Sequence, residues 1–128
     1  MRRRNQRDVG AVMVEFALVL PLLVVLGAAI VQFGIAYNRQ ITIQQAAREG
    51  ARALALDPQD TENAIAVAEA AAGDIDATAT ADGSACDNDT GVRFAQVDIT
   101  TDVEFGIPFV VALTTIELDA TARMRCGL

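Results

Sequence analysis

The sequence predicts an α+β protein: a long N-terminal helix, membrane-spanning in its first part, followed by a short second helix and a small antiparallel sheet of about three strands. Three observations predict this class. They are an uncharged apolar run near the N-terminus, a helical pattern of small residues that continues it, and an alternation of period two in the C-terminal half. The chain has 128 residues, of which 52% are hydrophobic. A soluble domain this short seldom carries so much apolar residue, so we expect part of it to face lipid.

The uncharged run covers 23 positions, from Phe16 to Asn38. A helix of that length spans about 34 Å, enough to cross a hydrocarbon core of roughly 30 Å. Residues 1–10 carry four arginines and one aspartate, whereas residues 53–122 carry one arginine and fourteen acids. The positive-inside rule therefore predicts a single pass through the cytoplasmic membrane at about residues 16–38, with residues 1–10 in the cytoplasm and residues 57–128 outside. A buried core helix is the alternative, but the remaining residues could hardly enclose it.

The helical pattern continues beyond the apolar run and predicts one helix over residues 11–56. Small and apolar residues recur there on one face: Ile43, Ala46, Ala47, Gly50, Ala51 and Leu54. Such a face allows close helix packing, either on the protein's own domain or on another subunit. Pro21 lies inside the predicted helix and should kink it, because proline removes one backbone hydrogen bond.

A second helix is predicted to begin at Asp57-Pro58, with Asp57 as N-cap and Pro58 at the first helical position. Gly73 should end it after about Ala72. The expected apolar stripe of this helix is small: Ile65, Ala68 and Ala72.

Apolar and polar residues then alternate over 75–81, 97–105 and 116–125, which predicts three strands with one buried face. Short connectors favour an antiparallel sheet, whose apolar face would pack on the C-terminal half of the long helix. The apolar segment 106–113 is expected to be a loop. It would either cover the sheet or touch the membrane or a neighbouring molecule.

Composition argues against catalysis and against nucleic-acid binding. The chain has no histidine and no lysine, and its single serine, Ser84, has no base to activate it. Two cysteines are too few for an all-thiolate zinc site, and a net charge of −7 disfavours phosphate contacts. The acidic segment 82–89 lacks the spacing of an EF-hand, so a solvated turn is favoured over a weak calcium site. We therefore expect no enzyme, metal, cofactor, small-molecule substrate or nucleic-acid partner.

Cys86 and Cys126 are the two cysteines of the chain, and both fall in the predicted external region. External thiols tend to oxidise, so a Cys86–Cys126 disulfide is predicted. Unpaired or intermolecular thiols are the alternative.

The segment from Gly10 to Phe16 combines a basic leader ending in glycine with a lone Glu15 at the head of the membrane helix. A carboxylate at that depth is costly unless it is paired. The segment resembles the N-terminus of type IV pilin-like proteins. That resemblance implies cleavage after Gly10 by a membrane peptidase, and pairing of the new amino group on Ala11 with the glutamate of a neighbouring subunit. A chance glycine and an interfacial glutamate are the alternative.

Residues 10–53 closely resemble the TadE-like family, the pseudopilins or minor pilins of tight-adherence (Tad/Flp) pili. The matching pieces are Val14-Glu15-Phe16-Ala17, Leu20-Pro21, Gln32-Phe33-Gly34 and the run from Gln45 to Arg52. The resemblance implies that residues 1–10 are the leader, Gly10 its last residue and Ala11 the mature N-terminus. It gives Glu15, with Phe16 beside it, the processing and assembly role. The implied partners are other pilin subunits, a prepilin peptidase and the inner-membrane Tad assembly platform.

Two other functions compete with this one. The first is a permanently membrane-anchored envelope protein that binds an external ligand through its strands. The second is a secreted protein cut by signal peptidase near Gly27-Ala28-Ala29. The mature N-terminus separates the three, since it would be Ala11 for a pilin, Met1 for the anchored protein and Ile30 for the secreted one.

Overall fold

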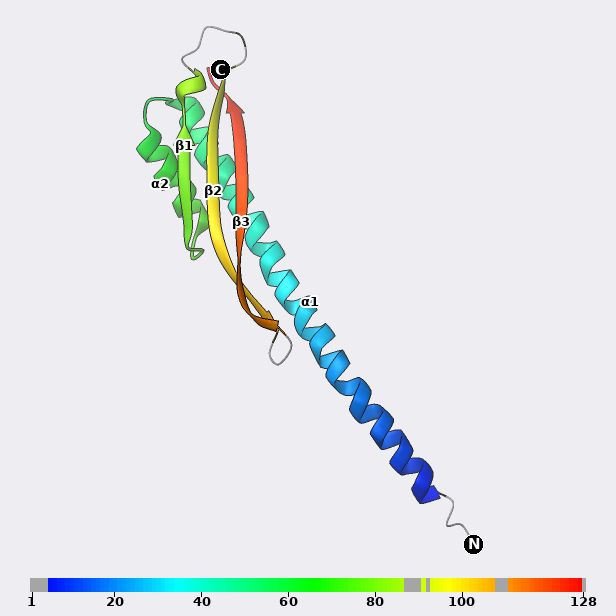
Figure 1. The fold of residues 1–128 in the computed structure, drawn as a ribbon. Coiled ribbons are helices and arrows are strands. Elements are labelled where there is room, and N and C mark those ends of the chain that lie inside the picture. Colours follow the sequence, from blue (N-terminus) through cyan, green and yellow to red (C-terminus); the bar gives the residue numbers. More distant parts are fainter. Residues whose placement is uncertain (1–4, 87–90, 92, 108–110, 128) are drawn as a thin grey trace.

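The computed structural model describes residues 5–86, 91, 93–107 and 111–127. Its elements in chain order are α1 (Asn5–Leu56), α2 (Thr61–Ala72), β1 (Ala77–Asp82), the 3-10 turn η1 (Ser84–Cys86), β2 (Phe94–Ile107) and β3 (Val111–Arg125). The N-terminal half of α1 projects away from the other elements, which gather around its C-terminal half (Figure 1). The predicted α+β class is confirmed.

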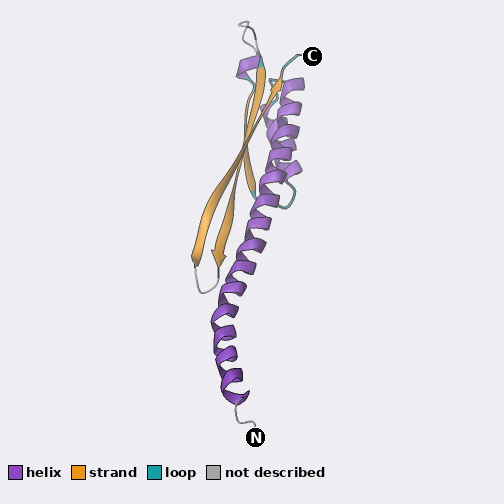
Figure 2. Cartoon of the chain, turned by 90° about the vertical axis from the view of Figure 1, so that its right-hand side faces the viewer, coloured by secondary structure: helices purple, strands orange, loops and turns teal. Residues whose placement is uncertain are grey.

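Helix α1 has 52 residues and is continuous through Pro21. Its N-terminal half curves gently rather than breaking (Figure 2). It is long and apolar enough to cross a membrane, and none of its most apolar window is buried inside the molecule. Apolar side chains left in water over this length would be strongly unfavourable, so the helix indicates a single-pass membrane anchor.

One face of the C-terminal half of α1 is instead buried by the domain. Five residues of its small-residue face are 0% exposed: Ile43, Ala46, Ala47, Ala51 and Leu54. Gly50 lies where α1 and α2 approach closely, because a Cβ atom there would stand 2.7 Å from the Cβ of Ala68. The sequence allowed the small-residue face to pack on the protein's own domain or on another subunit. In the structure it packs on the domain of the same chain.

Helix α2 begins later than predicted. Asp60, not Asp57, is the N-cap, and its carboxylate accepts a hydrogen bond from the backbone N–H of Asn63 at 3.0 Å. Asp57 instead accepts from the N–H of Gln59, so Pro58 lies in a turn and not in the first helical position. The prediction for this end is wrong, whereas Gly73 does end the helix, with φ of +67°.

The three strands form one antiparallel sheet in the order β1-β2-β3, with one face covered by the helices (Figures 1 and 2). Ala79, Ile99 and Ala120 lie side by side in the register, and all three are buried against the helices. Many core side chains are alanines, which lets the sheet approach α1 closely. Thr101 also falls on this buried face, where its hydroxyl donates a hydrogen bond to the carbonyl of Asp76 at 2.6 Å.

The apolar segment 106–113 is not the loop that the sequence predicted. Strand β2 extends to Ile107 and β3 begins at Val111, so most of the segment belongs to a hairpin, and residues 108–110 lie outside the described part. The pairing shifts between Phe105↔Thr114 and Ile107↔Val111, which sets Gly106 opposite two residues of β3. The hairpin end runs along α1 toward its N-terminal half (Figures 1 and 2). Ile116 was expected on the buried face, but it is 44% exposed, although its cross-strand partner Val103 is buried.

Candidate processing and assembly segment

The candidate processing residues all lie on the projecting end of α1. Val12, Glu15, Phe16 and Val19 are spaced at i, i+3, i+4 and i+7, and together they line a shallow surface depression. Phe16 is 62% exposed, and the other side chains of the strip are exposed as well. One carboxylate therefore stands in an otherwise apolar strip that faces outward from the molecule.

The Glu15 carboxylate has no hydrogen-bond or ion-pair partner among the residues that the structure describes. Ala11 lies one helical turn before it, so an amino group on Ala11 would be within reach of this carboxylate. In lipid, an unpaired carboxylate costs several kcal/mol or takes up a proton. The segment therefore offers a negative charge that is available to a partner.

Gly10 lies within α1, where glycine is a poor helix former, at a cost of about 1 kcal/mol relative to alanine. A Cβ atom at this position would meet nothing within 4 Å, so no contact within the described chain requires glycine. Gly50 on the same helix is the opposite case, since packing there leaves no room for a side chain. The glycine at position 10 thus has no explanation in this fold. Residues 1–4 of the predicted leader lie outside the described part.

The other predicted site residues lie in the domain, far from this end. Ala46, Ala47, Gly50, Ala51 and Leu54 pack on α2 and the sheet. Along α1, Leu54 is 43 residues from Ala11, or about 64 Å at the helical rise. The structure therefore separates one end that carries the candidate processing residues from another that carries the folded domain.

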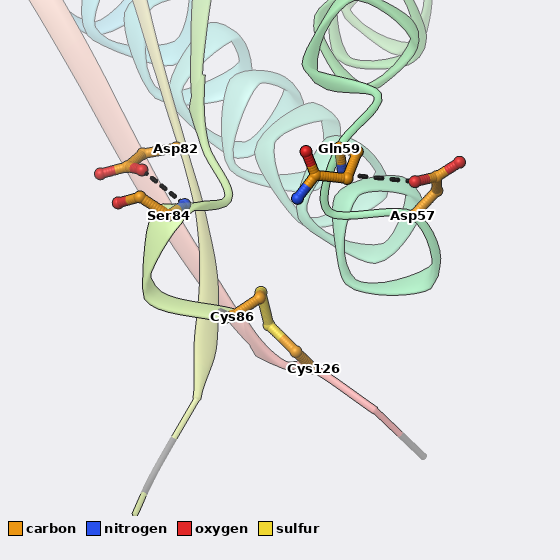
Figure 3. Close-up of a disulfide and its surroundings, with 6 residues drawn as sticks. All are labelled: Asp57, Gln59, Asp82, Ser84, Cys86 and Cys126. Atoms are coloured by element: carbon orange, nitrogen blue, oxygen red, sulfur yellow. Dashed lines mark hydrogen bonds between the residues drawn. A yellow bond between two sulfur atoms is a disulfide. The ribbon is translucent and has the colours of Figure 1, made fainter. Parts of the chain in front are cut away.

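Cys86 and Cys126 are joined by a disulfide in the structure, with their Cα atoms 5.7 Å apart (Figure 3). The bond ties η1 to the chain just after β3, where the N–H of Cys126 donates to the carbonyl of Arg93 at 3.1 Å. Cys86 is almost fully buried in the core. The disulfide thus closes the end of the sheet that is remote from the N-terminus of α1 (Figure 1).

The acidic segment beside the disulfide begins as an ordered turn. The carboxylate of Asp82 accepts a hydrogen bond from the backbone N–H of Ser84 at 2.9 Å (Figure 3). Hydrogen bonds from the Ser84 side chain, and then from its N–H, hold the pKa of the exposed Asp82 below its usual range. Asp87 and Asp89, part of the segment weighed as a calcium site, lie outside the described residues.

The outer face of the sheet carries a second acidic feature. Asp102 and Glu117 face each other across β2 and β3, and Asp76 lies with them around an open depression of about 210 Å³. Like charges placed directly opposite are unfavourable across strands. No group of three or more histidine, cysteine or acidic side chains within the described ranges is arranged to hold a metal ion.

Sequence reasoning missed two contacts from α1 to the sheet. The amide of Gln32 donates to the carbonyl of Gly106 and accepts from its N–H at 3.0 Å. The amide of Gln40 donates to the carbonyl of Asp119 at 2.8 Å. The available signal was that Gln32 is the first polar side chain after Glu15 in the apolar run. Its partner, 74 positions away, could not be read from the sequence.

Comparison with known families bears on this segment. Residues 10–52 match the family model described as TadE-like protein. The resemblance predicted from the sequence is therefore confirmed over this third of the chain, which includes Gly10, Glu15 and most of the helix face that packs on the domain. No curated protein and no solved structure matches the chain significantly.

Proposed function

We propose that this chain, TadE-like over residues 10–52, is a pseudopilin or minor pilin that takes part in the assembly, initiation or decoration of a Tad/Flp-type pilus used in adhesion. The family links the protein to the Tad pilus system in a structural rather than a catalytic capacity. The finer role is our inference from the N-terminal end of α1 and its relation to the domain.

The observation that carries the proposal is the Glu15 carboxylate, exposed in an apolar strip without a partner among the described residues. A membrane anchor alone has no use for a charge that costs several kcal/mol in lipid. A subunit that must recognise the N-terminus of another subunit does have a use for it. Buried charge pairs set register and partner choice more than they add affinity.

In this proposal a prepilin peptidase cuts after Gly10 on the cytoplasmic side of the membrane. The absence of a side chain at Gly10 leaves the peptide bond accessible to the peptidase. The fold itself does not require glycine there, because a Cβ atom would meet nothing within 4 Å in the described chain. The cut removes the basic leader and leaves an ammonium group on Ala11. The carboxylate of Glu15 on a neighbouring subunit then pairs with this ammonium group as the two helices come together.

The exposed apolar half of α1 supports such a transfer. Lipid tails and the side chains of other pilin helices are similarly apolar, so exchanging one environment for the other costs little transfer free energy. The apolar face of the C-terminal half of α1 is already covered by its own domain, and the opposite face is polar and charged. Helix contacts with other pilins would therefore involve the projecting half, and the acidic domain would decorate the surface.

The proposed location follows from the charge distribution. The basic leader lies in the cytoplasm, α1 crosses the cytoplasmic membrane once, and the acidic domain lies outside until the subunit joins a cell-surface pilus. The proposed partners are other pilin or pseudopilin subunits, the prepilin peptidase and the inner-membrane Tad assembly platform.

The test is Glu15→Gln, which keeps the shape and hydrogen-bonding capacity of the side chain but removes its charge. Cleavage after Gly10 should survive. Leaving one member of a buried charge pair unpaired costs roughly 2–5 kcal/mol. We therefore expect co-purification with the major pilin in sheared filaments to fall by about tenfold or more.

Glu15→Asp serves as the matched variant. It keeps the charge on a shorter arm and should give intermediate incorporation. If Glu15→Gln assembles as well as the wild type, charge pairing is wrong. A permanently anchored envelope protein that binds an external ligand would then explain the molecule better, and its N-terminus would be Met1.

A further inference from the structure

We propose that the end of the β2–β3 hairpin rests on the lipid surface, where the paired amide of Gln32 holds it at the outer boundary of the membrane span. The hairpin end is defined here by Phe105–Ile107 and Val111–Leu113. The inference rests on the membrane anchor alone, and it does not depend on cleavage after Gly10 or on pilus assembly.

The contact between Gln32 and Gly106 fixes the hairpin to one level of α1. Both polar groups of the Gln32 amide are used, one as donor to the Gly106 carbonyl and one as acceptor from its N–H. Gly106 lies at the register shift between Phe105 and Ile107, where the regular β ladder is interrupted. The backbone N–H and C=O groups of Gly106 therefore need partners outside the ladder. A Cβ atom there would stand 2.9 Å from the Leu113 side chain, so glycine suits this close approach.

The level of Gln32 matches the thickness of a bilayer. From Phe16 to Val31 the sequence has no polar side chain, and Gln32 is the first residue after this stretch that can form a side-chain hydrogen bond. The charged leader ends at Asp8, and Glu15 is the one charged residue between Asp8 and Arg39, so we place the start of the span at Ala11, five residues before the start at Phe16 that the uncharged run predicts. Gln32 lies 21 residues after Ala11, or about 32 Å along the helix, close to the roughly 30 Å of a hydrocarbon core. The span therefore ends near Gln32, several residues earlier than the limit of the uncharged run at Asn38.

Aromatic side chains just beyond Gln32 agree with a boundary at this level. Phe33 and Tyr37 are both exposed and stack with ring centroids 6.4 Å apart. Tyr37 is the single tyrosine of the chain. Tyrosine is enriched at the membrane–water interface, where its ring is apolar and its hydroxyl is hydrated. Arg39, the first charged residue after Glu15, follows within one turn.

The hairpin end has the surface that such a position requires. In a region that is strongly acidic elsewhere, the sequence from Phe105 to Ile116 carries no charged residue. Leu113 is 78% exposed, and Ala112 beside it is exposed as well. Contact with lipid would cover these apolar side chains, whereas the acids at Glu104 and Glu117 would remain in water.

The depth of the contact is limited by the backbone. Strand β3 is an edge strand, and its outer N–H and C=O groups cannot lie unpaired in the hydrocarbon core. The hairpin end therefore lies in the interfacial layer, level with the lipid headgroups, and does not insert deeply. Continuity with the membrane span, through Gln32, identifies lipid as the occupant of this surface.

The chain contains no tryptophan, so a single introduced indole reports on one position. We would place full-length, uncleaved Leu113→Trp in nanodiscs whose lipids carry a headgroup nitroxide, a short-range quencher. Leu56→Trp is the matched control, because Leu56 is 81% exposed but lies 24 residues beyond Gln32, about 36 Å along α1. We expect the indole at position 113 to be quenched and blue-shifted, and the one at position 56 to behave as in water.

Equal quenching at the two positions would overturn the proposal. A blue-shifted but unquenched indole at position 113 would also overturn it, because a protein surface rather than lipid would then cover the hairpin end. Gln32→Leu in the Leu113→Trp background tests the positioning role, with Gln40→Leu as its control. Quenching should fall for Gln32→Leu alone, and unchanged quenching in both would show that Gln32 does not hold the hairpin at the membrane.

Discussion

Gly50 and Gly34 lie on the same helix but have different surroundings. A Cβ atom at Gly50 would stand 2.7 Å from the Cβ of Ala68 and 3.2 Å from Cγ1 of Val97. A Cβ atom at Gly34 would meet nothing within 4 Å. The first glycine is therefore needed for the packing of α1 against α2 and the sheet, and the second is not.

We expect Gly50→Ala to destabilise the domain. Overpacking a close contact costs about 1–3 kcal/mol, and the better helix propensity of alanine returns only about 1 kcal/mol. Gly34→Ala should be neutral or slightly stabilising, because it gains the propensity without the clash. Thermal unfolding in detergent, followed by circular dichroism, measures both variants. Equal midpoints for the two would contradict the packing of α1 on α2.

Asp82 and Ser84 form a second local arrangement with a measurable consequence. Hydrogen bonds from Ser84 lower the pKa of Asp82, so the folded turn favours the ionised carboxylate. This contribution to stability is present above the unfolded pKa and is lost as the pH falls through the lower folded pKa. We expect Ser84→Ala to raise the pKa of Asp82 toward its usual value in a carboxyl-detected NMR titration. An unchanged pKa would show that the Ser84 hydroxyl does not hydrogen-bond to this carboxylate in solution.

At the scale of elements, hydrophobic periodicity predicted most of the fold. The continuous helix, the small-residue face around Gly50 and the three strands follow from repeats of 3.6 and two residues. The start of α2 did not follow, because Asp57 and Asp60 are both good caps and local preference cannot choose between them. In the structure Asp60 is the N-cap, and the turn before it is in tertiary contact, since a Cβ atom at Gly83 would overlap the carbonyl of Pro58.

The hairpin end also lay beyond sequence reasoning. An apolar stretch that contains Gly106 and a proline is typical of a loop, unless the residues that pair with it in space are known. In the structure, pairing with β3 extends β2 to Ile107, and Gln32 satisfies the backbone of Gly106. Both facts depend on residues distant in the chain. The processing segment needs no tertiary information to be proposed, because Gly10, Ala11 and Glu15 lie within one short stretch of sequence, and it stays a prediction.

The disulfide connects two elements that are far apart in sequence, η1 and the end of β3. Closing a loop of 40 residues stabilises a fold by about 3–4 kcal/mol in the chain-entropy model. The double variant Cys86→Ser with Cys126→Ser should therefore unfold at a markedly lower temperature than the oxidised wild type. Reduced wild type should match the variant. If reductant changes neither the unfolding temperature nor the mobility on a gel, the disulfide does not form in this protein.

At the scale of the whole molecule, one helix joins two parts with opposite requirements. Its N-terminal half exposes apolar side chains and a single carboxylate, whereas its C-terminal half packs one face against an acidic domain. The first half suits lipid or other helices, and the second contributes the Ile43–Leu54 face to the core of the domain on the same continuous helix.

The N-terminus of the mature protein tests this account most directly. Mass spectrometry of the protein from cells with an active prepilin peptidase should identify Ala11 as its first residue. Gly10→Val, whose branched side chain crowds the peptidase cleft, should leave the leader attached. A mature wild-type chain that still begins at Met1, or a Gly10→Val variant cut like the wild type, would contradict the assignment of this protein as a processed pilin-like subunit.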